Sequence, residues 1–197
     1  MNYSIIVDNF KKKKFNSPND ICIHSSGTIF FTDPPYGLRK YNKKRIEGYD
    51  GEMMYGGCYV FKYNPRQKKI QAVVTNMDRP NGIAFSNDER KIYITNSGKK
   101  RFIKSFKVDK NLNLKKPKIF AKTTKNKTFD GIRVDKNNKI WASCGKGIKC
   151  FLDNGKIFDY IKLPEIVSNL EFGGTNNDCL FITASTSLYM LKLNSKN

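Results

Sequence analysis

The chain repeats one short sequence pattern four times, and this repetition constrains the fold more than any other feature. The copies are SPNDICIHSSGTIFFTD from Ser17, RPNGIAFSNDERKIYITNS from Arg79, FDGIRVDKNNKIWAS from Phe129 and SNLEFGGTNNDCLFITAS from Ser168. Each copy has a small polar pair, an alternating apolar stretch, a turn rich in Gly, Asn, Asp and Ser, and a second apolar stretch. Such a pattern is typical of a β-hairpin that opens a repeated structural unit.

The spacing of the copies predicts a β-propeller. Equivalent positions at residues 19, 81, 130 and 169 are separated by steps of 62, 49 and 39 residues. The last two steps bracket the roughly 40–50 residues of a four-stranded propeller blade. The first step is longer because a segment rich in proline and glycine, without regular structure, runs from Asp33 to Gly57. Alternating strands without helix signals therefore favour an all-β propeller, with a β-sandwich as the alternative.

We expect one β-propeller domain that covers residues 1–197. Further strand-like stretches complete the units after the hairpins, namely CYVFKYN, IQAVVTN, FIKSFKVD, PKIFAKT, IKCFLDNGKIFDYIKL and SLYMLKLN. Together they amount to three and a half blades and a leading strand pair around SIIVDNF. Three and a half blades do not close a ring, and an open ring leaves strand edges unpaired. We therefore expect an incomplete propeller of about four to five blades that lacks its N-terminal blade.

The chain is strongly basic, but its charge distribution does not indicate a specific nucleic-acid site. There are 37 Lys and Arg residues against 17 Asp and Glu, which gives a formal net charge of +20. The basic residues are scattered through turns such as NPRQKK, SGKKR and LKKPK, rather than gathered on one stripe. We therefore expect only weak, salt-sensitive adhesion to nucleic acid, with a basic nucleic-acid-binding β-protein as an alternative. No run approaches the ~18–20 apolar residues of a membrane span, so we expect no membrane partner.

The cysteines indicate free thiols in a reducing compartment. The chain has five of them, an odd number, and no C-x-x-C pair; most lie within apolar strand patterns. The single histidine, His24, argues against a zinc site built from Cys and His. The first apolar stretch is short and is followed by lysines, unlike a signal peptide. The default expectation is a cytoplasmic protein, and the sequence does not predict its oligomeric state.

Four longer motifs together resemble the gluconolactonase branch of the senescence-marker-protein (regucalcin)/gluconolactonase/luciferin-regenerating-enzyme-like family. They are NSPNDICIHSSGTIFFTDPPYG, PNGIAFSNDERKIYIT, FDGIRVDKNNKIWAS and LEFGGTNNDCLFITASTSLYML, in the family's order and over essentially the whole chain. The resemblance implies a six-bladed propeller that binds one divalent cation on its axis and hydrolyses lactones. It also implies that the partner is a small-molecule sugar lactone.

The resemblance assigns roles to four residues. Asn81 of the PNG motif and Asp130 of the DG motif correspond to metal ligands, and Asp130 is also the implied catalytic base. Asn19 of the PND motif and Glu52 in GEMMYGGCYVF correspond to substrate contacts. The family's third metal ligand, a Glu in an EGP motif, has no counterpart here. We expect Ca²⁺ as the cation, with Mg²⁺, Mn²⁺ or Zn²⁺ as alternatives.

These residue types suit the implied chemistry, although a plainer interpretation stays open. Carboxylate and amide oxygens are ligands for hard dications. Such a cation polarises a carbonyl and acidifies bound water, and Asp130 could be both its ligand and the base that takes the water's proton. Alternatively, Asn-Gly and Asp-Gly make turns because Gly tolerates positive φ, and Asn19 begins an Asx turn. Tyr36 could either line the pocket or merely pack. Because one anionic ligand is missing, a catalytically inactive propeller fragment or binding module is the alternative function.

Overall fold

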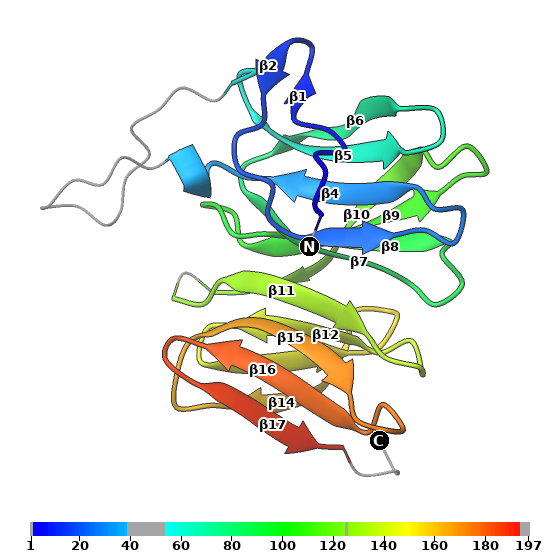
Figure 1. The fold of residues 1–197 in the computed structure, drawn as a ribbon. Coiled ribbons are helices and arrows are strands. Elements are labelled where there is room, and N and C mark those ends of the chain that lie inside the picture. The colour runs from blue at the N-terminus through cyan, green and yellow to red at the C-terminus, as the bar shows by residue number, and fades with distance from the viewer. Residues whose placement is uncertain (1, 39–53, 125, 194–197) are drawn as a thin grey trace, which may run out of the picture.

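The computed structural model describes residues 2–38, 54–124 and 126–193, and it confirms an all-β propeller (Figure 1). In this part of the chain the strands form four blade sheets and one small hairpin. The first three blades have four antiparallel strands each, and the fourth has three. The expected incomplete propeller of four to five blades is therefore confirmed, with four. No helix among the described residues is long and apolar enough to cross a membrane.

The strands of each blade follow chain order from the first strand to the last. Blade 1 consists of β3 (Ile21–Ile23), β4 (Ile29–Asp33), β5 (Cys58–Asn64) and β6 (Lys69–Met77). Blade 2 consists of β7 (Pro80–Phe85), β8 (Lys91–Asn96), β9 (Phe102–Val108) and β10 (Leu114–Lys122). Blade 3 consists of β11 (Phe129–Val134), β12 (Ile140–Cys144), β13 (Gly147–Phe151) and β14 (Ile157–Lys162). Blade 4 consists of β15 (Val167–Gly173), β16 (Cys179–Ala184) and β17 (Leu188–Lys192). A one-turn 3-10 helix, η1 (Tyr36–Leu38), follows β4, and a hairpin of β1 (Asn9–Phe10) and β2 (Lys13–Lys14) precedes blade 1.

All four hairpins that the repeats predict are present, as β3–β4, β7–β8, β11–β12 and β15–β16. The DNG turn between β13 and β14 has Gly155 at a φ of +86°, which a side chain would disfavour. The leading strand pair lies later than expected, with Asn9 opposite Lys14. Its turn residues, Lys11 and Lys12, both have positive φ, as a two-residue hairpin turn of type I′ requires.

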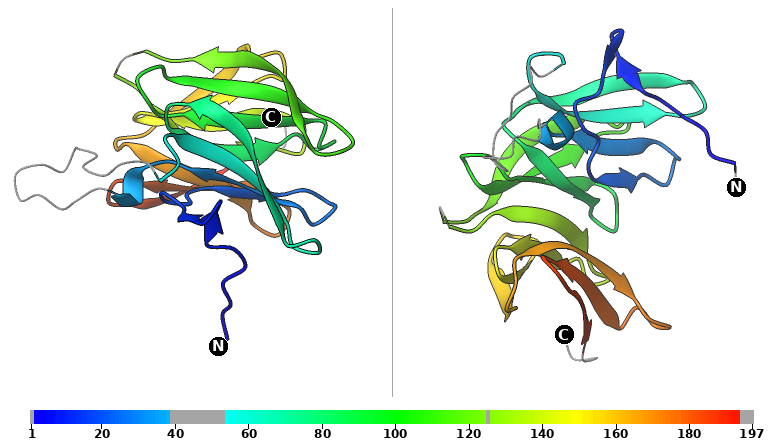
Figure 2. Two further views of the ribbon diagram at one scale, coloured as in Figure 1. Left: turned by 90° about the horizontal axis from the view of Figure 1, so that it is seen from above. Right: turned by 60° about the vertical axis from the view of Figure 1, so that its left-hand side comes forward.

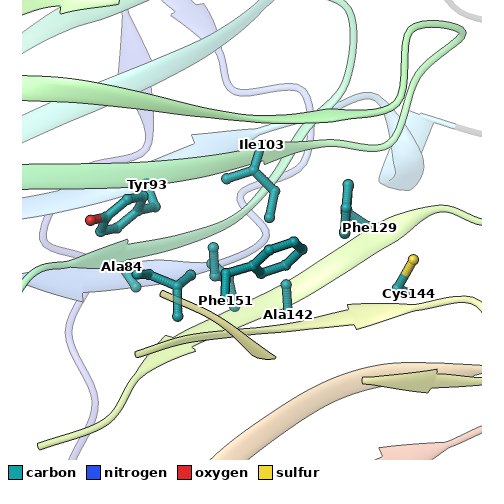
Figure 3. Packing of buried hydrophobic residues seen from close by; sticks show 9 residues of the cluster. Ala84, Tyr93, Ile103, Phe129, Ala142, Cys144 and Phe151 are labelled. Carbon is teal, nitrogen blue, oxygen red and sulfur yellow. The ribbon is translucent and has the colours of Figure 1, made fainter. Parts of the chain in front are cut away.

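The blades pack through one apolar cluster at each junction. Between blades 2 and 3, Tyr93 and Ile103 lie close to Phe129 and Phe151, and all four are buried (Figure 3). Equivalent clusters join blades 1 and 2 (Phe30, Val60, Val74, Met77, Ile83, Ile92, Ile94 and Phe106) and blades 3 and 4 (Trp141, Ile148, Cys150, Val167, Leu170, Leu180 and Ile182). The alternating apolar residues of the repeats therefore bury their side chains between neighbouring sheets.

The two ends of this arc of blades differ (Figure 2). The N-terminal segment packs on blade 1, where the Phe10 ring lies 5.0 Å from Phe61 and the Phe15 ring lies 5.2 Å from Phe31. On blade 4, Leu188 and Met190 are 72% and 63% exposed.

All five cysteines are free, as expected.

Candidate functional site

Asn81 and Asp130 occupy equivalent places in the first strands of blades 2 and 3. Thr32 Oγ1 in β4 donates a hydrogen bond to the Asn81 carbonyl oxygen at 2.7 Å. Thr95 Oγ1 in β8 donates in the same way to the Asp130 carbonyl oxygen, also at 2.7 Å. In blade 3, Ser143 Oγ donates to the Ser168 carbonyl oxygen of blade 4 at 3.4 Å, one residue before the equivalent position 169. The equivalence that the repeats predict is thus confirmed, because the preceding blade fixes each backbone by the same kind of bond.

Gly82 and Gly131 follow these two residues because neighbouring blades approach too closely for a side chain. A Cβ on Gly82 would overlap the Asp130 carbonyl oxygen and would lie 2.9 Å from the Ile132 nitrogen. A Cβ on Gly131 would overlap the side chain of Asn169 in blade 4. Both glycines lie inside strands, and neither has positive φ. The plainer interpretation of these pairs as positive-φ turns is therefore wrong.

The side chains of Asn81 and Asp130 meet in the structure. The Asn81 amide donates through Nδ2 to Ser97 Oγ at 3.0 Å, and its side chain lies near enough to the Asp130 carboxyl group to lower the pKa of that group by hydrogen bonding. Ser97 Oγ in turn donates to the Phe129 carbonyl oxygen at 2.6 Å. Asn81 is buried and Asp130 is half-buried. The fold therefore brings two of the predicted site residues into direct contact.

The surroundings of Asp130 shift its acidity. Burial raises the pKa of Asp130 to about 6; the hydrogen bond from Asn81 opposes this shift, and the negative charge of Asp20 adds to it. A carboxyl group with such a pKa is mostly ionised at pH 7, yet it takes up a proton far more readily than an ordinary aspartate. This acidity suits a general base that works near neutral pH.

Asp20 belongs to a polar network that connects the first strands of all four blades. Its Oδ2 accepts hydrogen bonds from the Ile83 N–H of blade 2 at 3.1 Å and from Arg133 Nη1 of blade 3 at 3.3 Å. Arg133 Nε also donates to Glu171 Oε2 of blade 4 at 2.6 Å. The charge of Asp20 is therefore compensated, whereas Asp130 has no ion pair among the described residues.

Tyr36 of η1 completes the group around Asn81 and Asp130. Its phenol oxygen shares side-chain hydrogen bonds with Ser97 and Asn81. Burial raises the pKa of Tyr36, and the nearby Asp130 charge raises it further. From the sequence, Tyr36 could either line the pocket or merely pack, and Ser97 was not identified as a site residue. The one available signal was the Pro-Pro pair of TDPPYG, because two prolines fix φ and therefore the position of the next side chain.

The other two predicted residues are not part of this group. The Asn19 N–H donates to the Thr32 carbonyl oxygen at 2.9 Å, so Asn19 begins blade 1 much as Asn81 begins blade 2. Its side chain is exposed and lines a cleft of about 280 Å³ together with Phe15 and Phe31. No hydrogen bond joins it to Asn81 or Asp130. Glu52 lies outside the described residues.

The oxygen donors at Asp130 are of the type that binds a hard cation, but only one of them is a carboxylate. They are the Asp130 carboxylate, the Asn81 side-chain carbonyl and the Ser97 hydroxyl, all of them oxygen ligands of the type that Ca²⁺ and Mg²⁺ prefer. The uncompensated charge of Asp130 also favours a cation there. Among the residues that the structure describes, no three or more His, Cys, Asp and Glu side chains gather to hold a metal. Ligation by Asn81 requires its amide to rotate, since Nδ2 now faces Ser97.

Comparison with known proteins indicates the family of the chain. The model of the SMP-30/Gluconolactonase/LRE-like region matches residues 2–186. A gluconolactonase from Zymomonas mobilis is 34% identical over 200 residues, which cover 96% of this chain and 54% of that protein. The structure of a gluconolactonase from Xanthomonas campestris has a TM-score of 0.85 and 32% identity over 95% of this chain and 61% of its own. Regucalcin from Agrobacterium tumefaciens, described as a calcium-binding protein, shares the fold at a TM-score of 0.69 and 17% identity.

The chain thus spans 54% of the length of the curated gluconolactonase and 61% of the gluconolactonase structure. Within that span the match covers nearly every described strand, from β1 to β16. The chain belongs to the SMP-30/gluconolactonase/LRE-like family.

Proposed function

We propose that this chain carries the hydrolytic site of a gluconolactonase-type enzyme, with Asp130 as its general base. The supporting observation is a half-buried carboxyl group that has a pKa of about 6, a hydrogen bond from Asn81 and no ion pair among the described residues. Gluconolactonases at 32% and 34% identity support a sugar lactone as the substrate. The free thiols are in keeping with a cytoplasmic location.

The proposed cofactor is one divalent cation held by Asp130 and Asn81. The hard oxygen donors favour Ca²⁺, and Mg²⁺, Mn²⁺ and Zn²⁺ are the alternatives. When bound, such a cation supplies Lewis acidity that polarises a carbonyl and acidifies water. Asn19 and Glu52 are proposed substrate contacts; Asn19 would meet the substrate from the start of blade 1.

The residues of the chain account for the proton movements of the proposed reaction. Asp130 takes a proton from the water that attacks the lactone carbonyl carbon. The bond between the carbonyl carbon and the ring oxygen then breaks, and the ring oxygen receives the proton from Asp130. Water and lactone are consumed, and one open-chain hydroxy acid forms. In the cation-free chain, burial raises the pKa of Asp130 to about 6, so this carboxyl group exchanges its proton near neutral pH.

A catalytically inactive binding module is the second candidate, and the single carboxylate of the site favours it. The charge of the ligands tunes the affinity for a hard dication. A site with one charged and otherwise neutral donors therefore binds a cation more weakly than one with two carboxylates.

Hydrolysis of D-glucono-δ-lactone, followed by proton release at neutral pH, distinguishes the two candidates. The wild type with Ca²⁺ should exceed the spontaneous rate, and EDTA should abolish the excess. Asp130→Asn should reduce the catalysed rate at least about a hundredfold. The exposed Asp153→Asn, 67% accessible, is the matched control and should leave the rate unchanged. A wild type that shows only the spontaneous rate with each of the four cations would refute the enzyme and favour the binding module.

A further inference from the structure

The sheet of blade 4 has an open strand edge. Blades 1, 2 and 3 each have a fourth strand, which pairs antiparallel with the third. Among the described residues, the sheet of blade 4 ends at β17, which pairs with β16 alone (Figure 1). An edge of this kind can take up an added strand through its free backbone N–H and C=O groups.

The side chains of β17 also lack the cover that their counterparts have. Leu188 lies opposite Thr183, in the pairing that places a third-strand residue opposite Thr or Ser in every other blade. Leu188 is 72% exposed, whereas its three counterparts are 0% exposed. These counterparts are Val60, Ile103 and Ile148. The outer part of blade 4 therefore presents an apolar surface that the fold covers in the other blades.

The N-terminal segment YSIIV, which begins at Tyr3, has the properties of a strand but belongs to none. Tyr, Ile and Val are the residue types that favour strands. Tyr3 and Ile5 are 95% and 77% exposed, and Val7 packs on blade 1. In an extended segment Tyr3 and Ile5 lie on one face, two residues apart, which is also the spacing of Leu188 and Met190 in β17. The segment therefore matches the open edge in length and in its apolar face.

The position of the segment favours exchange between two copies of the chain. Val7 holds it at the blade 1 end of the arc, and β17 lies at the other end (Figure 2). The four residues before Val7 extend at most about 14 Å, whereas three blade junctions of about 10 Å each separate blade 1 from blade 4 along the arc. A second copy brings its own segment to the edge without this limit.

The distribution of charge also favours a second copy. Four exposed lysines at 11–14 follow the segment. Residues 163–193, which contain blade 4, hold three acidic side chains and one basic side chain, in a chain with a formal net charge of +20. Blade 4 is thus an acidic part of a basic molecule, and it attracts the lysines beside the incoming segment.

We propose that the N-terminal segment of one copy pairs with β17 of a second copy and completes its blade 4 as a fourth strand. The pairing is antiparallel, as it is between the third and fourth strands of blades 1, 2 and 3. Tyr3 and Ile5 of one copy then lie beside Leu188 and Met190 of the other, so that apolar surface of both is buried. Reciprocal exchange gives a two-fold symmetric dimer.

Disulfide cross-linking tests which strands meet. Ile5→Cys is combined with Met190→Cys or, to allow for the register, with Leu188→Cys; all three positions are exposed. Directly opposite residues of paired strands have Cβ atoms about 4.5–5.5 Å apart, close to disulfide geometry. Mild oxidation should therefore give a covalent dimer on a non-reducing gel. Ile5→Cys combined with Ile157→Cys is the matched control, because Ile157 is 58% exposed on blade 3, and this variant should remain monomeric.

Sedimentation velocity measures the association without a cross-link. The wild type should form a dimer, and Ile5→Asp should raise its dissociation constant at least about tenfold, because a charge replaces a buried apolar side chain. Ile157→Asp, the same change on blade 3, should leave the dissociation constant unchanged. A wild type that stays monomeric, an equal effect of the two Asp variants, or a cross-link that forms within one chain would each overturn the proposal.

Discussion

Replacing Asp130 by Asn should stabilise the metal-free protein at pH 8. The pKa of this carboxyl group is about 6 in the folded protein against 3.8 for an ordinary aspartate. The native state therefore holds the proton more tightly than the unfolded chain does between these two values. The free energy of unfolding falls as the pH rises through this window and then stays constant. A difference of about 2 pKa units corresponds to roughly 3 kcal/mol, and we expect a gain of about 2–3 kcal/mol for Asp130→Asn above the window.

Urea unfolding in EDTA, followed by the fluorescence of the single tryptophan, Trp141, measures this gain. The difference between Asp130→Asn and wild type should be largest at pH 8 and should approach zero below about pH 3.8, where the carboxyl group is protonated in both the folded and the unfolded chain. Asp153→Asn, on the surface, should show no such difference at either pH. Added Ca²⁺ at a free concentration c should stabilise the wild type by RT ln(1 + c/Kd) and leave Asp130→Asn unaffected.

A gain that is absent at pH 8, or equally large near pH 4, would refute the idea that burial of the charge destabilises the fold. Confirmation would mean that the chain keeps a carboxylate at a place where a neutral amide makes a more stable protein. Such a residue is retained for what its charge does, because packing alone favours the amide.

Three further changes test the junctions between blades and the acid side of the stability curve. Thr95→Val leaves the Gly82 N–H and the Asp130 carbonyl unpaired, which were bonded at 2.7 Å each, so urea unfolding should show a loss of about 2–4 kcal/mol. Thr183→Val, at the equivalent but exposed place in blade 4, should lose less than about 1 kcal/mol, and equal losses would argue against the junction role. Gly82→Ala should destabilise by more than about 3 kcal/mol or prevent folding, because its Cβ overlaps the next blade; a native-like melting temperature would contradict this packing. Hydrogen bonds from a serine hydroxyl and a backbone N–H lower the pKa of Glu165 to about 2, so its stabilising effect is complete above about pH 4.5 and is lost as the pH falls towards 2. Thermal unfolding of Glu165→Gln should therefore show a weaker acid dependence than the wild type, and an identical slope would exclude this contribution.

The propeller could be predicted from the sequence because the signals for its hairpins lie close together in the chain. Each hairpin combines alternating apolar residues with a turn, and both features lie within about twenty residues of one another. The equivalence of Asn81 and Asp130 was predictable for a related reason. Repeated units place matching residues at matching positions, and the bonds from Thr32 and Thr95 show that they do.

Contacts between units could not be predicted in the same way. Tyr36 reaches Asn81 only because blades 1 and 2 pack together, and no periodicity encodes that approach. Ser97 contacts Asn81 within the β7–β8 hairpin of blade 2. The role of the glycines was predicted wrongly for a similar reason. A glycine such as Gly82, which precedes an apolar stretch in the sequence, can permit either positive φ or close packing. Only the structure of the neighbouring blade distinguishes the two roles. The leading strand pair was misplaced because its turn consists of Lys11 and Lys12, which are not typical turn residues.

The position of the site residues and the affinity of the site depend on different parts of the molecule. Asn81 and Asp130 are placed by the junctions on either side of blade 2, through the Thr32 and Thr95 bonds and through apolar clusters that these four blades contain. Arg133 adds a connection from blade 3 to blades 1 and 4. None of these contacts requires a closed ring, so the pair keeps its geometry in the arc. Cation affinity instead depends on how many carboxylates converge there, and among the described residues only Asp130 does. Adding a second carboxylate by Ser97→Asp should therefore tighten the binding of Tb³⁺, a luminescent substitute for Ca²⁺, whereas a variant that binds no more tightly would show that geometry limits the site.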